Sequence, residues 1–300
     1  MSTTVGTPPS MPVSVAPDSN WQTTAPVPLT RRSFLDVLAG TLPVIKVPHF
    51  ISSELSEKIV QQLQPRFTPY LHATGPPVDK VGVAQFEFQA QSEEDMKSRR
   101  GDEKQRYLDE VKKVASLHDD LSAAVGTNVW QKVIDTLATL VPEWDVEVAR
   151  EPSCGDHQYY SGIFRKINHG TPPHCDWCPY DVPAEEGWIL SKISCQAVFN
   201  LYLTPATTGG RTTIYDVQWT EDALRYRDPE SYGYSRALVD GHAQCSFDVE
   251  VGQLCIFNSR NMHEVAPVGD QNAPRIALAS FIGLLPSEVT GGKPRLIFWS

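Results

Sequence analysis

The chain lacks the features that would assign it to a membrane or secreted class. Among its 300 residues, no apolar run approaches the roughly 20 residues of a membrane helix, and residues 1–30 hold no apolar core of signal-peptide length. Six cysteines are scattered along the chain without a compact disulfide framework, at Cys154, Cys175, Cys178, Cys195, Cys245 and Cys255. We therefore expect a cytoplasmic protein in a reducing compartment, with no membrane partner.

An excess of basic residues is also lacking. The chain has 26 Lys and Arg against 36 Asp and Glu, which gives a net charge of −10. This balance disfavours a nucleic-acid partner, because such binding surfaces are basic, but it says nothing about the fold. Hydrophobic residues make up 41% of the chain, which is enough for a packed core. No internal repeat is visible, and the oligomeric state stays unknown.

The composition divides the chain into a short N-terminal segment and one large domain. Residues 1–30 are rich in Pro, Ser, Thr and Val and almost uncharged, so we expect a flexible tail or an arm draped on the surface. Order is expected to begin near Arg31. Residues 31–300 are expected to form a single catalytic domain, in which a helical and mixed support region at 31–143 packs on a core at 144–300.

The support region alternates between helical and extended patterns. A short strand is predicted at 43–47, and a helix runs from an N-cap at Ser53 to about Gln64. Residues 81–90 alternate as in a strand, whereas 92–113 carry both charge signs, as on a solvated helix. A further helix is predicted from an N-cap at Thr127, after Gly126, to Pro142.

From Trp144 onward the pattern is that of a β protein. Short β-branched and aromatic runs, separated by Gly, Pro, Asn and Asp, occur at 144–150, 157–167, 191–203, 211–218, 243–249, 252–257, 263–268, 275–284 and 294–299. Many short strands with turn signals predict a sandwich or barrel. We therefore expect a mainly β fold with flanking helices, a cupin-like jelly roll with the N-terminal α/β portion packed on one sheet.

Three residues have the spacing of a metal site. His174 and Asp176 point the same way if they lie on an extended strand, after a turn at 170–173. His263 begins a distant strand, and Arg275 opens the next one, so we expect these two on neighbouring antiparallel strands. Two histidines and one carboxylate are the ligand pattern of non-haem Fe(II) oxygenases. Arg275 is suited to a dianionic co-substrate, because guanidinium binds carboxylate through two parallel hydrogen bonds.

The order and spacing of these elements, across 157–284, resemble the Fe(II)/2-oxoglutarate-dependent dioxygenase superfamily, especially its prolyl-hydroxylase-like branch. The matching segments are 160–166 (YSGIFRK), 173–176 (PHCD), 199–203 (FNLYL), 209–213 (GGRTT) and the strands of His263 and Arg275. The resemblance implies a double-stranded β-helix. It also implies Fe(II) held by His174, Asp176 and His263, with Arg275 on the distal carboxylate of 2-oxoglutarate.

One departure from the family concerns the support of this arginine. The common Arg-x-Ser form is absent, because Ala277 occupies the third position, so a hydroxyl of Thr212 or Tyr202 is expected to replace the serine. With Fe(II) as cofactor and 2-oxoglutarate and O2 as co-substrates, the resemblance implies release of succinate and CO2 and oxidation of an unactivated C–H bond.

Further candidates have two interpretations each. Asn200 and Tyr202 share a strand face and either bind co-substrate or substrate, or form an outward polar pair. Thr212 matches the family's Gly-Gly-x-Thr element, with a structural role as the alternative. Arg165 either binds a carboxylate of substrate or co-substrate or forms a surface ion pair. Tyr159 or Tyr160 is expected to point inward beside it, and we assign Tyr160 to co-substrate binding.

The substrate is left open between two classes of oxygenase. The first is a small molecule carrying a carboxylate, either a free or modified amino acid or an intermediate of specialised metabolism, which is hydroxylated, desaturated or cyclised. The alternative is a protein hydroxylase of the prolyl-hydroxylase type, with residues 1–30 and 92–126 serving peptide binding. A third interpretation is a cupin that holds zinc or manganese and takes no 2-oxo acid.

Overall fold

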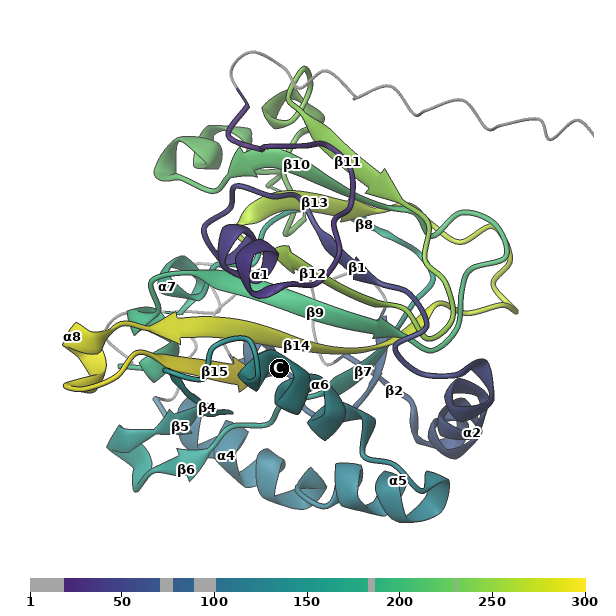
Figure 1. Cartoon of the computed structure of the whole chain (residues 1–300), viewed down its shortest axis with the longest axis vertical. Coiled ribbons are helices and arrows are strands. Elements are labelled where there is room, and N and C mark those ends of the chain that lie inside the picture. Colours follow the sequence, from purple (N-terminus) through teal and green to yellow (C-terminus); the bar gives the residue numbers. More distant parts are fainter. Residues whose placement is uncertain (1–18, 71–77, 89–100, 183–186, 230) are drawn as a thin grey trace, which may run out of the picture.

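The computed structural model describes residues 19–70, 78–88, 101–182, 187–229 and 231–300. The described part is mainly β, as predicted (Figure 1). Its strands are β1 (Ile45–Val47), β2 (Thr68–Pro69), β3 (Val78–Val81), β4 (Asp145–Val148), β5 (Arg150–Glu151), β6 (His157–Gln158), β7 (Ile163–Ile167), β8 (Thr171–His174), β9 (Gln196–Tyr202), β10 (Thr212–Gln218), β11 (Gln244–Phe247), β12 (Leu254–Asn258), β13 (Asn261–Val265), β14 (Ile276–Leu285) and β15 (Arg295–Trp299). Its α-helices are α1 (Arg31–Leu38), α2 (Ser53–Leu63), α4 (Glu103–Val114), α5 (Leu117–Val125), α6 (Val129–Ala138), α7 (Cys178–Asp181) and α8 (Ser287–Thr290).

Two sheets face each other. The large sheet has nine strands, in the order β1-β12-β9-β14-β7-β3-β2, with β15 paired to β14 and β4 paired to β15. The small sheet has the order β11-β10-β13-β8, and β5 and β6 form a separate hairpin. All pairings are antiparallel except that of β15 with β4. Phe257 of the large sheet lies 5.0 Å from the ring of His263 in the small sheet, so the two inner faces are in contact.

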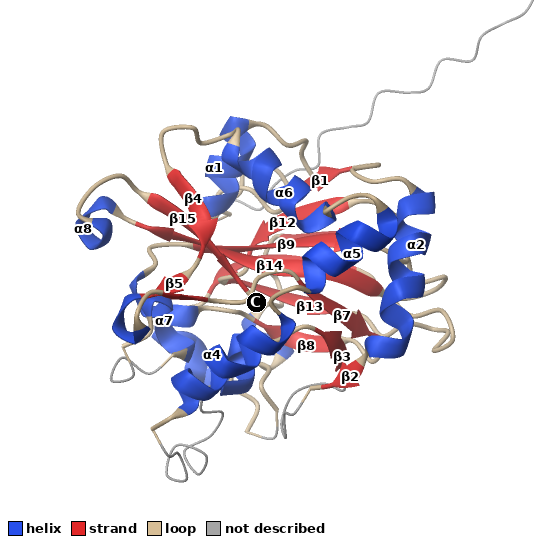
Figure 2. Cartoon of the chain, turned by 90° about the horizontal axis from the view of Figure 1, so that it is seen from below, coloured by secondary structure: helices blue, strands red, loops and turns tan. Residues whose placement is uncertain are grey.

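Helices cover the outer face of the large sheet (Figures 1 and 2). His118 of α5 stacks on Trp130 of α6 and lies 5.8 Å, ring to ring, from Phe164 of β7. The side chain of Phe164 is fully buried there. The N-terminal region is therefore a support for this sheet, as its sequence suggested, and it also contributes strands β1, β2 and β3 to the sheet itself.

The ordered chain begins earlier than Arg31. Trp21 is 3% exposed, and Val27 forms a bridge with Ile45 at the edge of β1. The Ser19 hydroxyl and the Asn20 amide both donate to Asp216 of β10, each at 2.6 Å. Residues 19–30 thus lie as an arm against the domain, whereas residues 1–18 fall outside the described part.

In two helices the N-cap residue is the neighbour of the predicted one. Ser52, not Ser53, caps α2 by accepting from the Leu55 amide, and Asn128, not Thr127, caps α6. The predicted helix at 92–113 appears as α4, although residues 92–100 lie outside the described part.

The strand predicted at 81–90 is wrong over its described residues. β3 ends at Val81, and Gln85–Phe88 form a 3-10 helix, η2. Gly82 explains the break, because its φ of 110° turns the chain and a Cβ there would lie 2.6 Å from the Tyr160 ring.

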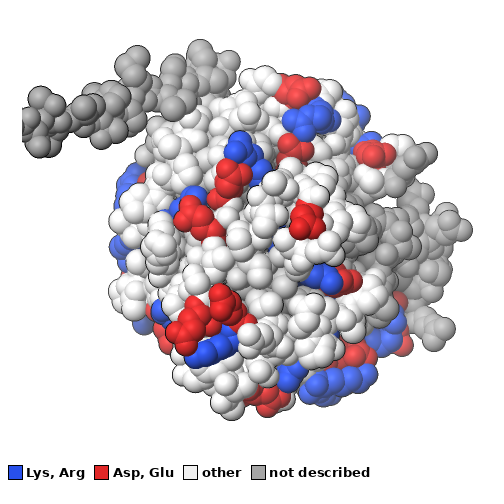
Figure 3. All heavy atoms as spheres, turned by 90° about the vertical axis from the view of Figure 1, so that its right-hand side faces the viewer, with Lys and Arg blue, Asp and Glu red and all other residues white. Residues whose placement is uncertain are grey.

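The nine strand segments predicted beyond residue 144 each overlap a strand, but β8 was predicted as a turn. Pro172 and Pro173 occupy this strand, and proline is tolerated there because β8 lies at the edge of the small sheet. Within the described ranges, every helix is too short or too polar to cross a lipid bilayer. On the face in Figure 3, acidic and basic side chains lie in small mixed groups.

Candidate metal centre

Two neighbouring strands of the small sheet bring the histidines together. His174 is the last residue of β8, and it lies directly opposite His263 of β13 in the antiparallel register. The two ring centroids are 4.2 Å apart. Asp176 follows β8 by two residues, and one of its carboxylate oxygens lies 3.5 Å from Nε2 of His263. One donor atom from each of the three residues lies within 4.8 Å of the other two.

Backbone carbonyls fix the orientation of both imidazoles. Nδ1 of His174 lies 2.8 Å from the Pro172 carbonyl, and Nδ1 of His263 lies 2.9 Å from the Asn261 carbonyl. Because a carbonyl only accepts, each Nδ1 carries the proton and donates it. Each Nε2 is thereby left as a free lone pair, which is how metal-binding histidines are usually oriented.

The corner between the sheets holds Asp176. Ser259 lies between β12 of the large sheet and β13 of the small sheet, and its carbonyl accepts from the Asp176 amide at 2.9 Å. The Ser259 hydroxyl donates back to the Asp176 carbonyl at 3.2 Å. Asn258 fastens the same corner to α1, since its side-chain amide donates to the carbonyls of Val37 and Leu38. The carboxylate ligand is therefore fixed through its backbone.

The protonation states suit a divalent cation. Burial, together with the neighbouring His263, lowers the pKa of His174 to about 4, so its imidazole is neutral at pH 7. Burial works to raise the pKa of Asp176, but the interactions with His263, His174 and Arg165 outweigh it, and the pKa is lowered. Two imidazoles and one carboxylate fit the donor set that holds Fe(II) in oxygenases.

Arg275 lies across the interior from this cluster. It directly precedes β14 of the large sheet, whereas His263 lies in the small sheet, so the expectation of neighbouring strands is wrong: the chain crosses between sheets after β13. The guanidinium is 3% exposed, and its Nη2 donates to the Tyr202 hydroxyl at 3.1 Å and to the Thr212 hydroxyl at 3.0 Å. Both hydroxyls expected in place of the missing serine therefore contact it.

This arginine retains unused hydrogen-bonding capacity. Its Nε is buried and has no acceptor among the described residues. A buried cation without a carboxylate is costly unless a ligand supplies one. The arrangement fits the distal carboxylate of 2-oxoglutarate.

A second guanidinium, of Arg165, faces the same interior. Arg165 of β7 pairs in register with Ala277 of β14, which in turn pairs with Tyr202, so the three side chains share the inner face. Its Nε donates to the Tyr70 hydroxyl at 2.9 Å, and its guanidinium carbon lies 5.6 Å from the Phe281 ring. No carboxylate in the described ranges forms an ion pair with Arg165, whereas the nearby Lys80 is paired with Glu87.

Of the remaining residues that the sequence suggested for the site, one faces the interior and the others do not. Asn200 lies on the inner face two residues before Tyr202 and is partly buried. Tyr160 is not brought to the site: its hydroxyl donates to the Gly162 carbonyl, and its ring stacks on His118 under the helices. The reason is that residues 160–162 precede β7 on the outer side of the large sheet. Tyr159 is buried beside Tyr107 and Trp188, with its hydroxyl on Glu151.

Sequence reasoning missed several residues of the site. Tyr70 contacts Arg165 from 95 positions away, and Ser259 reaches Asp176 across 83 positions. Tyr232 packs edge-on against His174, at 5.2 Å between ring centroids. No local pattern marks these residues, because each reaches the site only through the tertiary fold.

Sequence comparison finds related proteins in fungi and bacteria. The chain is 34% identical over 230 residues to the leucinostatins biosynthesis cluster protein S of Purpureocillium lilacinum, covering 75% of this chain and 86% of that protein. It is 32% identical over 159 residues to an L-gamma-glutamyl-L-propargylglycine hydroxylase of Streptantibioticus cattleyicolor, covering 52% and 54%. No family model matches the sequence.

Structure comparison identifies the same fold in a known dioxygenase. An N-substituted L-amino acid dioxygenase from Burkholderia ambifaria superposes with a TM-score of 0.52 at 12% identity, over 89% of this chain and 91% of that one. Its complex with alpha-KG gives 0.53 at 13% identity, over 89% and 90%. The chain belongs to the same family as the leucinostatins biosynthesis cluster protein S, and it has the fold of the N-substituted L-amino acid dioxygenase.

Proposed function

We propose that His174, Asp176 and His263 hold the Fe(II), and that Arg275, supported by Tyr202 and Thr212, binds the distal carboxylate of 2-oxoglutarate. The observation that carries this proposal is the convergence of the three donor atoms within 4.8 Å, with both Nδ1 atoms committed to backbone carbonyls. In this proposal the two facing sheets are a double-stranded β-helix, and the metal lies between them near β8.

The protein residues have separate tasks in this scheme. Bound Fe(II) supplies the oxidative decarboxylation of 2-oxoglutarate and the oxidation of a C–H bond. His174, Asp176 and His263 would hold the metal and supply three of its ligands. Phe257 packs against His263 and helps to exclude water from the site. Asn200 faces the same interior, where its amide suits hydrogen bonding to co-substrate or substrate.

The substrate in this proposal is a small molecule with a carboxylate, of the amino-acid type. Arg165 supports it, because this guanidinium faces the interior and its only described polar contact is the Tyr70 hydroxyl. The related bacterial protein is named as a hydroxylase of an amino-acid derivative, and the superposed structure is named as an amino acid dioxygenase. Hydroxylation is the default outcome, and desaturation or ring closure would use the same site.

The peptide-hydroxylase alternative is less well supported. The segments that it assigned to peptide binding pack against the domain where they are described: Trp21 of the arm is 3% exposed, and Tyr107, Leu117 and Leu121 of α4 and α5 are buried.

We also propose that the catalytic domain is a single unit that begins by residue 19. The support region and the core share the large sheet, which favours this division.

Turnover of 2-oxoglutarate tests the proposed function. Protein purified without oxygen is given Fe(II), 2-oxoglutarate, O2 and a panel of amino acids and acylated amino acids, and succinate is measured. We expect His174→Ala to lower succinate formation at least 100-fold, because one of the metal ligands is lost. His242→Ala, at an exposed histidine, is the matched control and should leave the rate unchanged.

Metal analysis of the same preparation separates this proposal from a zinc or manganese cupin. Succinate formation that survives His174→Ala, or a protein that retains zinc and never binds 2-oxoglutarate, would contradict the proposal. Thermal unfolding of each variant shows whether a lost rate reflects a lost fold.

A further inference from the structure

The hydroxyl of Tyr232 is buried beside the metal centre without a hydrogen bond in the described structure. The Tyr232 ring meets His174 edge-on, at 5.2 Å between centroids and an interplanar angle of 70°. The Thr171 side chain interacts with this phenol, but outside hydrogen-bond geometry.

The segment that carries Tyr232 is held firmly in place. The Tyr234 amide donates to the Pro173 carbonyl of β8 at 2.8 Å. Gly233 lies against Pro172 so closely that a Cβ would approach the proline ring to 2.6 Å. These contacts fix the position of the phenol relative to His174, because β8 ends at that histidine.

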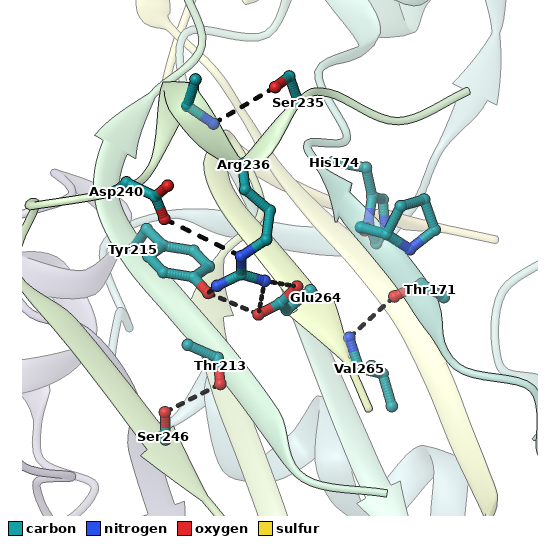
Figure 4. A network of polar contacts seen from close by, with 12 residues as sticks. Thr171, His174, Thr213, Tyr215, Ser235, Arg236, Asp240, Ser246, Glu264 and Val265 are labelled. Atoms are coloured by element: carbon teal, nitrogen blue, oxygen red, sulfur yellow. Dashed lines mark hydrogen bonds and ion pairs between the residues drawn. The ribbon is translucent and has the colours of Figure 1, made fainter. Parts of the chain in front are cut away.

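A charged anchor behind the small sheet secures the same segment. Nη1 of Arg236, in the short helix η7 (Arg236–Leu238), donates to both carboxylate oxygens of Glu264, at 2.9 and 2.8 Å. Nη2 of Arg236 also donates to the Tyr215 hydroxyl at 3.1 Å (Figure 4). Glu264 adjoins His263 in β13, so the anchor and the metal ligand share one strand on opposite faces.

A buried hydroxyl without a partner destabilises a protein, so the expected partner is a ligand. Arg165 lies on the inner face of the large sheet, in register with Ala277, and Tyr232 lies against His174 beside the small sheet. The two donors therefore approach the site from different sides. A ligand over the metal is suited to contact both.

The formal charges of the proposed metal site, the co-substrate and the two interior arginines indicate what this ligand carries. Ferrous ion, Arg275 and Arg165 together bring four positive charges, while Asp176 and 2-oxoglutarate bring three negative charges. Lys80 and Glu87 neutralise each other as an ion pair. Because uncompensated buried charge is costly, a ligand with one net negative charge completes the balance. A zwitterionic amino acid has no net charge, whereas an N-acylated amino acid has one carboxylate and no ammonium group.

We propose that the substrate is an N-acylated amino acid, whose carboxylate binds Arg165 and Tyr70 and whose acyl oxygen accepts a hydrogen bond from Tyr232. This inference rests on the proposed function and narrows its substrate class. It places Tyr232 in direct contact with the substrate and the acylated nitrogen near the metal.

Calorimetric binding without turnover tests this inference. Protein loaded with Mn(II) and 2-oxoglutarate in the absence of oxygen is titrated with L-leucine, L-proline and L-glutamine, each in the free form, as the N-acetyl acid and as the N-acetyl methyl ester. We expect at least one N-acetyl acid to bind at least tenfold more tightly than its free and ester forms. Tyr232→Phe should weaken that binding about tenfold, and Tyr226→Phe, at an exposed tyrosine, should not change it.

The 2-oxoglutarate titration that precedes these runs separates the two proposals. If Mn(II)-loaded protein does not bind 2-oxoglutarate, the proposed function itself fails. If 2-oxoglutarate binds, the inference is overturned by equal affinity for free and N-acetylated acids, by absence of binding of every N-acetyl acid, or by unchanged affinity in Tyr232→Phe. Binding of 2-oxoglutarate by Tyr232→Phe at the unaltered affinity serves as evidence that this variant is folded.

Discussion

At the residue scale, two arginines on one inner sheet face have different surroundings, and these suit them to different anions. Arg275 is 3% exposed and bonded to two hydroxyls that are themselves buried, so its guanidinium is fixed before a ligand arrives. Arg165 has one such partner, Tyr70, and is only partly buried. The fixed guanidinium fits a co-substrate of constant shape, and the less constrained one fits a more variable substrate.

Removing one of the two hydroxyl groups that bind Arg275 tests whether this arginine is the one that binds 2-oxoglutarate. We expect Thr212→Val to weaken 2-oxoglutarate binding about tenfold, because a hydrogen bond to a charged group contributes about 1.5–3 kcal/mol. Thr213→Val is the matched control, since that threonine lies on the opposite face and bonds Ser246. Anaerobic titration of the Mn(II)-loaded protein measures the affinity. Equal losses in the two variants would contradict a specific role for Thr212.

At the element scale, the sequence pattern located most strands but did not say which sheet each one joins. The alternation in 263–268 and 275–284 is the same whether two consecutive strands pair or lie in opposite sheets, so β13 and β14 were wrongly expected to be neighbours. β8 was missed because its prolines resemble a turn, although an edge strand tolerates them. The convergence of His174, Asp176 and His263 was nonetheless predictable, since His174 and Asp176 lie only two positions apart in the sequence. Tyr70 and Tyr232 were not, because only tertiary packing brings them to the site.

Packing of α5 on the large sheet makes stability depend on pH through His118. Nε2 of His118 lies 3.0 Å from the Ser161 carbonyl, and burial lowers the pKa of this histidine to about 4. Between pH 6.5 and 4 the unfolded chain therefore binds a proton that the folded chain does not. The free energy of unfolding is therefore unaffected by His118 above pH 6.5, and it decreases as the pH falls below 6.5.

Replacement of this histidine should remove that loss. Between pH 7 and pH 5 we expect the free energy of unfolding of the wild type to fall by about 2 kcal/mol more than that of His118→Gln, at up to about 1.4 kcal/mol per pH unit. Glutamine retains a donor for the Ser161 carbonyl. Urea unfolding at the two pH values measures the difference, with His242→Gln as an exposed control. Parallel losses in wild type and His118→Gln would show that His118 is already protonated in the folded protein.

At the scale of the whole molecule, the proposed metal and 2-oxoglutarate would join two sheets that otherwise meet through side-chain packing. The histidines belong to the small sheet, Asp176 is fixed to the corner at Ser259, and Arg275 belongs to the large sheet. Metal binding alone engages the small sheet and that corner. Binding of 2-oxoglutarate between the metal and Arg275 spans the interior, so it should stabilise the assembled pair of sheets rather than either one.

This geometry predicts an ordered gain in thermal stability. A ligand at 100 times its Kd stabilises a protein by about 2.7 kcal/mol, which corresponds to a rise in Tm of roughly 5 °C for a chain of this size. We expect Mn(II) to raise Tm first and 2-oxoglutarate to add a further rise only when Mn(II) is present. His174→Ala should lose both increments, whereas Arg275→Gln should keep the metal increment and lose the second. If 2-oxoglutarate stabilised the metal-free protein equally well, or stabilised Arg275→Gln as much as the wild type, the co-substrate would not bind between the triad and Arg275.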